Sequence, residues 1–126
     1  MEGIFCIDDD MVTLMICKRI IEKSGVTSTI HSASNGLEGV EKLEDLLQKN
    51  HLPQLILLDL NMPVMNGWDF LNTIQNDESY QKIHVVILSS TVDPADFEKT
   101  KNYAMVKGFI SKPLTVENLL DIYKSF

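Results

Sequence analysis

Short apolar runs without polar interruption recur along the chain, and such runs are typical of strands covered on both faces of a sheet. The runs occupy residues 4–7, 55–58, 85–88 and 109–110. A fifth segment, residues 27–31, is more polar and fits a strand at a sheet edge. The pattern therefore predicts five strands.

Stretches with the apolar spacing of helices lie between these strands. The apolar positions are Val12, Met15, Ile16 and Ile20, then Val40, Leu43 and Leu47, then Leu71 and Ile74, and finally Val116, Leu119, Leu120 and Tyr123. Ser24-Gly25 has the composition of a helix end, and Asp93-Pro94 that of a helix start. The helix predicted over 94–105 has few apolar positions, mainly Phe97 and Ala104, so we expect it to be the least firmly packed.

Five strand-then-helix repeats in 126 residues require parallel strands with right-handed crossovers and helices on both faces. We therefore predict an α/β fold with a doubly wound parallel sheet. A chain of this length has room for one domain, residues 1–126, and none for a second folded unit.

Polar residues lie just past the end of four of the predicted strands. Asp8, Asp9 and Asp10 follow the first strand, Asp59 the third, Ser89 the fourth and Lys112 the fifth. Open α/β sheets bind ligands beyond the carboxyl ends of their strands, at the point where the winding reverses. We expect these side chains to converge in one crevice.

Each residue has an ordinary structural explanation when it is taken singly, because aspartates cap helices and Ser or Lys-Pro are common in loops. Their joint placement favours a chemical site. Clustered carboxylates repel one another unless a cation is present, and carboxylate oxygens are the ligands that Mg²⁺ selects. With Lys112 and Ser89 as an anion pocket beside the metal, Asp59 is the candidate nucleophile toward phosphorus.

Composition narrows the classes of partner. The 18 acidic residues outnumber 11 Lys and Arg, for a net charge of −7, and such a surface repels nucleic acid and anionic lipid. No apolar run approaches the length of a bilayer span, and the N-terminus lacks the pattern of a signal peptide. We expect a cytoplasmic protein with protein or cation partners, and with Cys6 and Cys17 as free buried thiols.

The chain resembles the receiver domains of two-component response regulators over essentially its whole length. The matching segments are Ile7-Asp8-Asp9-Asp10, residues 57–67 from Leu57-Leu58-Asp59 to Asn66-Gly67, Leu88-Ser89-Ser90, and Phe109-Ile110-Ser111-Lys112-Pro113. The resemblance is to stand-alone members similar to the chemotaxis regulators. It implies a flavodoxin-like sheet of strand order 2-1-3-4-5 with five helices.

The resemblance also implies a role for each matched residue. Asp59 would take a phosphoryl group from a phosphohistidine on a sensor histidine kinase or a histidine phosphotransfer protein. Asp8, Asp9, Asp59 and the backbone carbonyl of Asn61 would hold Mg²⁺, while Asp10 would cap a helix. Ser89 and Phe109 would switch the face formed by the fourth helix, fifth strand and fifth helix, Lys112 would contact the phosphoryl group, and a cis bond would precede Pro113.

Three functions stay open from the residues. The first is a phosphorylation-controlled binding module that acts on a downstream protein, with homodimerisation on phosphorylation left undecided. The second is a Mg²⁺-dependent aspartyl-phosphate phosphatase, which is disfavoured because Asn61 stands where such enzymes carry a general acid. The third is a receiver-like scaffold that is never phosphorylated, which is weakened because every chemical position is filled. We expect a signalling phosphoacceptor that catalyses only its own phosphoryl transfer and dephosphorylation.

Two departures from the family pattern concern spacing. About six extra residues between Asp9 and Asp59 are expected to extend the second helix and its loop, around residues 48–53. One extra residue between Ser89 and Lys112 leaves Ser90 as an alternative switch hydroxyl, but Ser89 is preferred because it directly follows the apolar strand.

Overall fold

A computed structural model describes residues 3–91 and 93–125, and all statements below concern these residues. The strands are β1 (Ile4–Ile7), β2 (Ile30–Ala33), β3 (Leu55–Leu58), β4 (His84–Ser89) and β5 (Val106–Ser111). The helices are α1 (Met11–Ser24), α2 (Gly36–Gln48), α3 (Gly67–Ile74), α4 (Pro94–Thr100) and α5 (Val116–Lys124), with a 3₁₀ turn at Glu78–Tyr80.

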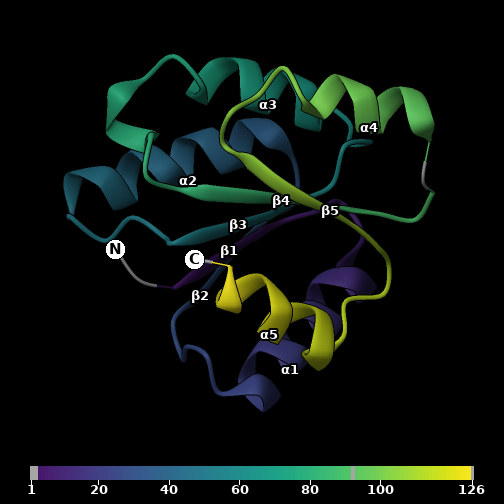
Figure 1. The fold of residues 1–126 in the computed structure, drawn as a ribbon. Coiled ribbons are helices and arrows are strands. Elements are labelled where there is room, and N and C mark those ends of the chain that lie inside the picture. Colours follow the sequence, from purple (N-terminus) through teal and green to yellow (C-terminus); the bar gives the residue numbers. More distant parts are fainter. Residues whose placement is uncertain (1–2, 92, 126) are drawn as a thin grey trace.

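The strands form one parallel sheet of order β2-β1-β3-β4-β5. Helices α1 and α5 cover one face, and α2, α3 and α4 cover the other (Figure 1). The winding reverses beside β1, because the chain passes from β1 outward to β2 and then back across to β3. The predicted doubly wound α/β fold and its strand order are confirmed.

Two apolar layers hold the helices against the sheet. Under α2 and α3 the layer contains Phe5, Ile56, Phe70 and Leu71, and under α1 and α5 it contains buried residues such as Leu57 and Leu119. Burying an aliphatic or aromatic side chain of this size contributes about 1.5–3 kcal/mol. Because β1 and β3 are buried along their whole length, the residues that follow them are held on a rigid support.

The predicted strand positions are confirmed with shifts at the two ends of the sheet. The edge strand β2 spans Ile30–Ala33 instead of 27–31, and β5 spans Val106–Ser111 instead of 109–110. Both strands are only partly buried, so their sequences lack the continuous apolar run that located the central strands.

One predicted helix end was wrong. The segment 94–105 is helical only as far as Thr100, and a turn then leads to β5. The helix predicted around Val12, Met15 and Ile16 is present as α1, but these three residues are exposed, while Cys17 and Ile21 are buried. Apolar residues surround the first turns of α1, so periodicity alone did not identify the face that packs on the sheet.

The predicted helix ends are confirmed. Asp10 caps α1 by accepting a hydrogen bond from the Val12 amide at 2.9 Å, and Asp93 caps α4 by accepting one from Ala95. Gly25 ends α1 with φ 74°, in the left-handed region that glycine adopts without steric cost. In the described part of the chain, no helix combines the length and the apolar character needed to cross a bilayer.

Candidate functional site: an acidic pocket at the carboxyl ends of the strands

The sheet brings the predicted site residues to one edge. Asp8 directly follows β1, Asp59 follows β3, and Lys112 follows β5, where Ser89 ends the neighbouring β4. Backbone hydrogen bonds continue the strand pairing into the site, from the Asp59 amide to the Ile7 carbonyl at 3.0 Å and from the Lys112 amide to the Ser89 carbonyl at 2.8 Å. Parallel strands in register therefore place residues from four distant segments side by side.

Three carboxylates meet in this pocket. Asp8, Asp9 and Asp59 each direct one oxygen so that the three atoms lie within 4.8 Å of one another. Asp8 and Asp59 are buried, and Asp9 is exposed. Asp10 belongs to the helix cap instead, which confirms its predicted role.

Lys112 is the counter-ion of the pocket. Its Nζ lies 2.7 Å from Asp8 Oδ2 and 3.8 Å from Asp59 Oδ1. The second oxygen of Asp8 accepts a hydrogen bond from the Asp10 amide at 2.9 Å. Burial opposes the charge on Lys112, but the hydrogen bond to Asp8 and the charges of Asp59 and Asp8 raise the pKa of this lysine.

The environment of Asp59 disfavours its charged form. Burial and the nearby negative charge of Asp8 raise the pKa of Asp59 to about 6, although the Lys112 charge and a hydrogen bond from the Asn61 amide act in the opposite direction. A carboxylate with this pKa is ionised at neutral pH and is costly to hold in a buried position.

In the absence of divalent cations, Asp59→Asn should stabilise the protein at neutral pH by about 2 kcal/mol. The reason is that the folded state holds the Asp59 proton more tightly than the unfolded state. The stability contributed by this group is complete below the unfolded pKa and is lost as the pH rises through about 6. Urea unfolding of both proteins in a chelator, at about pH 4 and about pH 7.5, measures the difference.

The same experiment contains its own control. Asp69→Asn, at an exposed position in the first turn of α3, should show no comparable dependence of the stability change on pH. Equal stabilisation by Asp59→Asn at both pH values would contradict a raised pKa at this residue.

The donor set fits a hard divalent cation. Three carboxylates facing the ammonium of Lys112 leave two negative charges uncompensated in a largely buried space. Mg²⁺ prefers oxygen ligands, and it is bound through a small number of carboxylates while keeping several waters. The exposed Asp9 leaves a solvent side for such waters. The backbone carbonyl of Asn61 stays a predicted further ligand.

The hydroxyl of Ser89 is occupied by its own loop. It donates to the Thr91 carbonyl at 2.8 Å and accepts from the Thr91 amide at 3.3 Å. Ser89 is buried at the end of β4, whereas Ser90 is exposed. The assignment of Ser89 rather than Ser90 as the switch hydroxyl stays a prediction.

Aromatic contacts join α4 to its neighbours. The rings of Phe97 in α4 and Phe109 in β5 lie 6.2 Å apart between centroids. On the other side, Lys99 Nζ lies 4.4 Å from the centre of the Trp68 ring in α3. Within α4 itself the one buried residue is Thr100. The helix is therefore held mainly by these surface contacts, as its sparse apolar pattern indicated.

A close backbone approach behind Asp59 was missed by sequence reasoning. A Cβ atom at Gly67 would lie 2.5 Å from the Asp59 carbonyl oxygen and 2.8 Å from Leu60 Cα. The Gly67 amide also donates to the Leu60 carbonyl at 3.0 Å. The position of Gly67 directly before a helical pattern was the available signal, because glycine at such a point often marks close packing.

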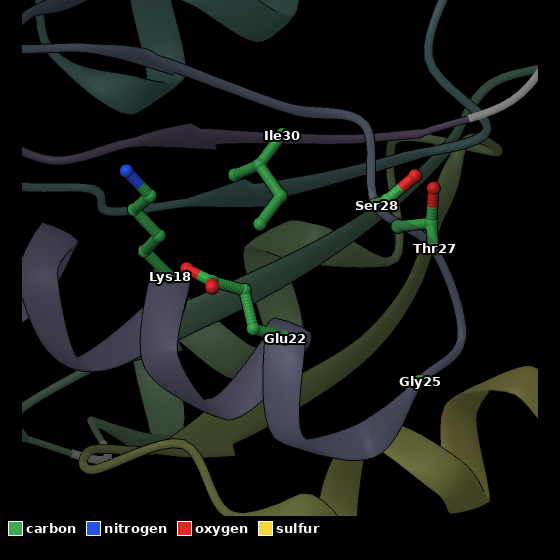
Figure 2. A pocket seen from close by; sticks show the side chains of 6 residues that line it. All are labelled: Lys18, Glu22, Gly25, Thr27, Ser28 and Ile30. Carbon is green, nitrogen blue, oxygen red and sulfur yellow. The ribbon is translucent and has the colours of Figure 1, made fainter.

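A wide surface hollow of about 740 Å³ lies elsewhere, between α1 and the start of β2. Figure 2 shows its lining, with Lys18 and Glu22 on the helix and Thr27 and Ser28 on the connecting loop. The loop precedes β2, so the hollow is at the amino end of that strand, remote from the carboxylates. The hollow is therefore not a candidate for the chemical site, although it is wide.

Comparison with known proteins gives a consistent result. The family model for the response regulator receiver domain matches residues 4–124. The polar-differentiation response regulator DivK of Brucella ovis is 26% identical over 125 residues, which cover 99% of this chain and 95% of the relative.

Solved structures agree with the sequence relatives. A two-component response regulator from Cytophaga hutchinsonii superposes with a TM-score of 0.91 at 30% identity, covering 98% of this chain and 95% of the other. One from Legionella pneumophila has a TM-score of 0.83 at 26% identity, with coverage of 99% and 97%. The chemotaxis protein CheY4 of Vibrio cholerae, with a TM-score of 0.81 at 23% identity and coverage of 99% and 98%, shares the fold.

Proposed function

The chain belongs to the response regulator receiver domain family, and from this premise we propose that it is a signalling phosphoacceptor in which Asp59 receives a phosphoryl group from a phosphohistidine. The observation that carries the proposal is the position of Asp59. Its carboxylate lies at the carboxyl edge of the sheet, buried among Asp8, Asp9 and Lys112. A nucleophile held between a metal site and a lysine suits phosphoryl transfer.

Mg²⁺ would be held by Asp8, Asp9, Asp59 and the Asn61 carbonyl. When bound, it supplies positive charge to the oxygens of the phosphoryl group. The protein's own residues do the rest: an Asp59 oxygen bonds to phosphorus while the phosphorus–nitrogen bond breaks and its electron pair returns to the donor imidazole. Lys112, already 3.8 Å from Asp59 Oδ1, can follow the new negative charge with a small rotation of its side chain.

The response would begin at Ser89. A phosphoryl group adds nearly two negative charges and three acceptor oxygens, and it would draw the Ser89 hydroxyl away from the Thr91 carbonyl. Phe109 would then move inward and leave its contact with Phe97. In this way the modification at Asp59 would change the face formed by α4, β5 and α5, which controls a downstream protein.

The proposed partners follow from this chemistry. The donor would be a sensor histidine kinase or a histidine phosphotransfer protein. Both proteins would act in the cytoplasm, because a reducing compartment keeps the two buried thiols free. The acidic chain would not bind nucleic acid directly. A homodimer formed on phosphorylation is an outcome that light scattering of the phosphorylated protein would reveal.

The proposal is tested by incubating the protein with acetyl phosphate and Mg²⁺ and measuring its intact mass. We expect the mass to rise by one phosphoryl group, with reduction by borohydride mapping the acyl phosphate to Asp59. With a chelator in place of Mg²⁺ the gain should disappear. The proposal would be contradicted if the protein gained no mass, or if it gained the same mass in the presence of the chelator.

Lys112→Ala should separate metal binding from the response. The variant loses the ammonium that contacts Asp8 at 2.7 Å, so Mg²⁺ binding should be retained or strengthened, as measured by calorimetry. Lys99 of α4 lies over the ring of Trp68, the one tryptophan of the chain, so we expect the proposed change at α4 to alter the fluorescence of Trp68 on phosphorylation. In the variant this change should be lost or greatly reduced. Loss of metal binding instead would show that the role of Lys112 has been misassigned.

Lys107→Ala is the matched control for this substitution. Lys107 is an exposed lysine in β5, the strand that precedes Lys112, and its Nζ contacts the Ala104 carbonyl rather than the pocket. It should keep both metal binding and the fluorescence response.

A further inference from the structure

Four side chains join α3 to α4 on the face of the sheet that both helices cover (Figure 1). Lys99 Nζ of α4 lies 4.4 Å from the centre of the Trp68 ring in α3. The ring of Tyr103, in the turn after α4, lies 5.8 Å from the Trp68 ring between centroids, and its hydroxyl donates to Asn72 Oδ1 of α3 at 2.8 Å. We call these four residues, Trp68, Asn72, Lys99 and Tyr103, the α3–α4 clasp.

Helix α4 has little other attachment. Thr100 is its one buried residue, and Phe97 is exposed although its ring lies 6.2 Å from that of Phe109 in β5. The helix therefore lies between two sets of contacts, with Phe109 on the β5 side and the clasp on the α3 side. An element with few buried apolar contacts is displaced at little cost, so these two sets of contacts decide where α4 rests.

The α3 side of the clasp is fixed directly behind Asp59. The amide of Gly67, the residue before Trp68, donates to the Leu60 carbonyl at 3.0 Å, and a Cβ at Gly67 would lie 2.5 Å from the Asp59 carbonyl oxygen. Four of the eight residues of α3 are buried, against one of the seven in α4. When the clasp opens, α4 is therefore the helix that shifts.

We propose that the clasp is an autoinhibitory contact, which holds α4 in its resting position and opens when α4 responds to phosphorylation of Asp59. The inference rests on the proposed function, in which Phe109 moves inward and leaves Phe97. Once that contact is lost, the clasp is what still opposes a shift of α4. Lys99 and Tyr103 are positioning residues in this scheme, because they act on the site through α4.

The clasp should also weaken the binding of a ligand that mimics the phosphoryl group. If a ligand at Asp59 favours the open clasp, then opening the clasp favours that ligand by the same factor. Beryllofluoride is a tetrahedral anion that binds reversibly to an aspartate in place of a phosphoryl group. Its affinity in the presence of Mg²⁺ therefore measures the coupling between Asp59 and α4 at equilibrium.

Lys99→Ala should bind beryllofluoride with Mg²⁺ about threefold more tightly than the wild type in calorimetry, which is the factor expected from the loss of an exposed cation–π contact. Lys99→Arg keeps a cation that stacks on an aromatic ring, so it should retain the wild-type affinity. Lys101→Ala is the matched control. Lys101 stands at the same end of α4, but its Nζ contacts residues of α4 itself, the Glu98 carboxylate at 3.0 Å and the Phe97 ring at 5.6 Å. This variant should also keep the wild-type affinity.

Tyr103→Phe tests the other half of the clasp. The substitution keeps the ring beside Trp68 and removes the hydroxyl that donates to Asn72. Asn72 is exposed, so water can satisfy the oxygen that loses its donor. We expect beryllofluoride to bind this variant about threefold more tightly as well, because the loss of one hydrogen bond has an effect of this order.

Hydrogen exchange in the absence of beryllofluoride measures the clasp without reference to Asp59. In a peptide that spans α4, the amides should exchange about threefold faster in Lys99→Ala than in the wild type. Lys101→Ala should exchange at the wild-type rate.

Tighter binding in Lys99→Ala and Tyr103→Phe, with wild-type affinity in Lys99→Arg and Lys101→Ala, supports the proposal. A contact with a merely structural role would give faster exchange with unchanged or weaker binding, and this result overturns the proposal, as does unchanged exchange. If the wild type itself does not bind beryllofluoride, the function proposed for Asp59 fails, whereas faster exchange in Lys99→Ala still supports the clasp as the contact that restrains α4.

Discussion

Asp59→Ala is expected to abolish the uptake of phosphoryl mass from acetyl phosphate. The remaining carboxylates of the pocket cannot take its place for structural reasons. Asp8 is engaged on both oxygens, by Lys112 at 2.7 Å and by the Asp10 amide at 2.9 Å, and Asp9 is exposed on the rim. Only the Asp59 carboxylate combines burial at the carboxyl edge with a pKa raised to about 6, so intact mass should show a loss to background.

Asp10→Asn is the matched control for this experiment. Asp10 is the third member of the aspartate run, yet its carboxylate caps α1 through the Val12 amide, and asparagine fulfils that role almost equally well. The variant should therefore gain phosphoryl mass as the wild type does. Equal uptake by Asp59→Ala, or loss of uptake in Asp10→Asn, would show that the acceptor has been wrongly assigned.

Gly67→Ala is expected to destabilise the fold by about 3 kcal/mol, since overpacking against atoms that cannot move costs up to this amount. The added Cβ would meet backbone on two sides, the Asp59 carbonyl oxygen at 2.5 Å and Leu60 Cα at 2.8 Å. Relief requires α3 to move away from the strand end that carries Asp59. Phosphorylation should therefore slow together with the loss of stability, and urea unfolding with an acetyl phosphate assay measures both.

Gly108→Ala tests whether close approach is the cause. A Cβ at Gly108 would find Val86 side-chain atoms at 3.7 and 3.9 Å, which is ordinary van der Waals contact. This variant should change stability by no more than about 0.5 kcal/mol. If the two alanine variants proved equally stable, the contact behind Asp59 would not be the reason for glycine at position 67.

The central strands of the sheet could be predicted from the sequence, because a strand that is buried on both faces has a continuous run of apolar residues. Strands β1, β3 and β4 appear as unbroken apolar runs, and the structure places them at the predicted residues to within one position. The signature weakens wherever one side faces solvent. The position of β2, the length of β5 and the end of α4 at Thr100 were accordingly predicted less well.

The members of the site were accessible for a different reason. In a parallel sheet every strand ends at the same edge, so a residue's place after a strand is enough to bring Asp8, Asp59 and Lys112 together. Which of these side chains form an ion pair could not be predicted from the sequence. The preference of Lys112 for Asp8 over Asp59, by 2.7 against 3.8 Å, depends on how β5 and its following loop settle against β1 and β3.

By itself the sequence determined the doubly wound parallel sheet, the chemical groups at the carboxyl edge and the helix caps at Asp10 and Asp93, since these follow from spacing along the chain. The tertiary structure alone decided that Val12 and Met15 face solvent, that the Ser89 hydroxyl bonds to Thr91, and that Cys6 and Cys17 share one buried apolar layer. These features depend on which distant segments share a space. The physical reason for the difference is that periodicity records the alternation of apolar and polar positions, whereas burial, pKa and side-chain pairing are set by neighbours that the chain brings together only on folding.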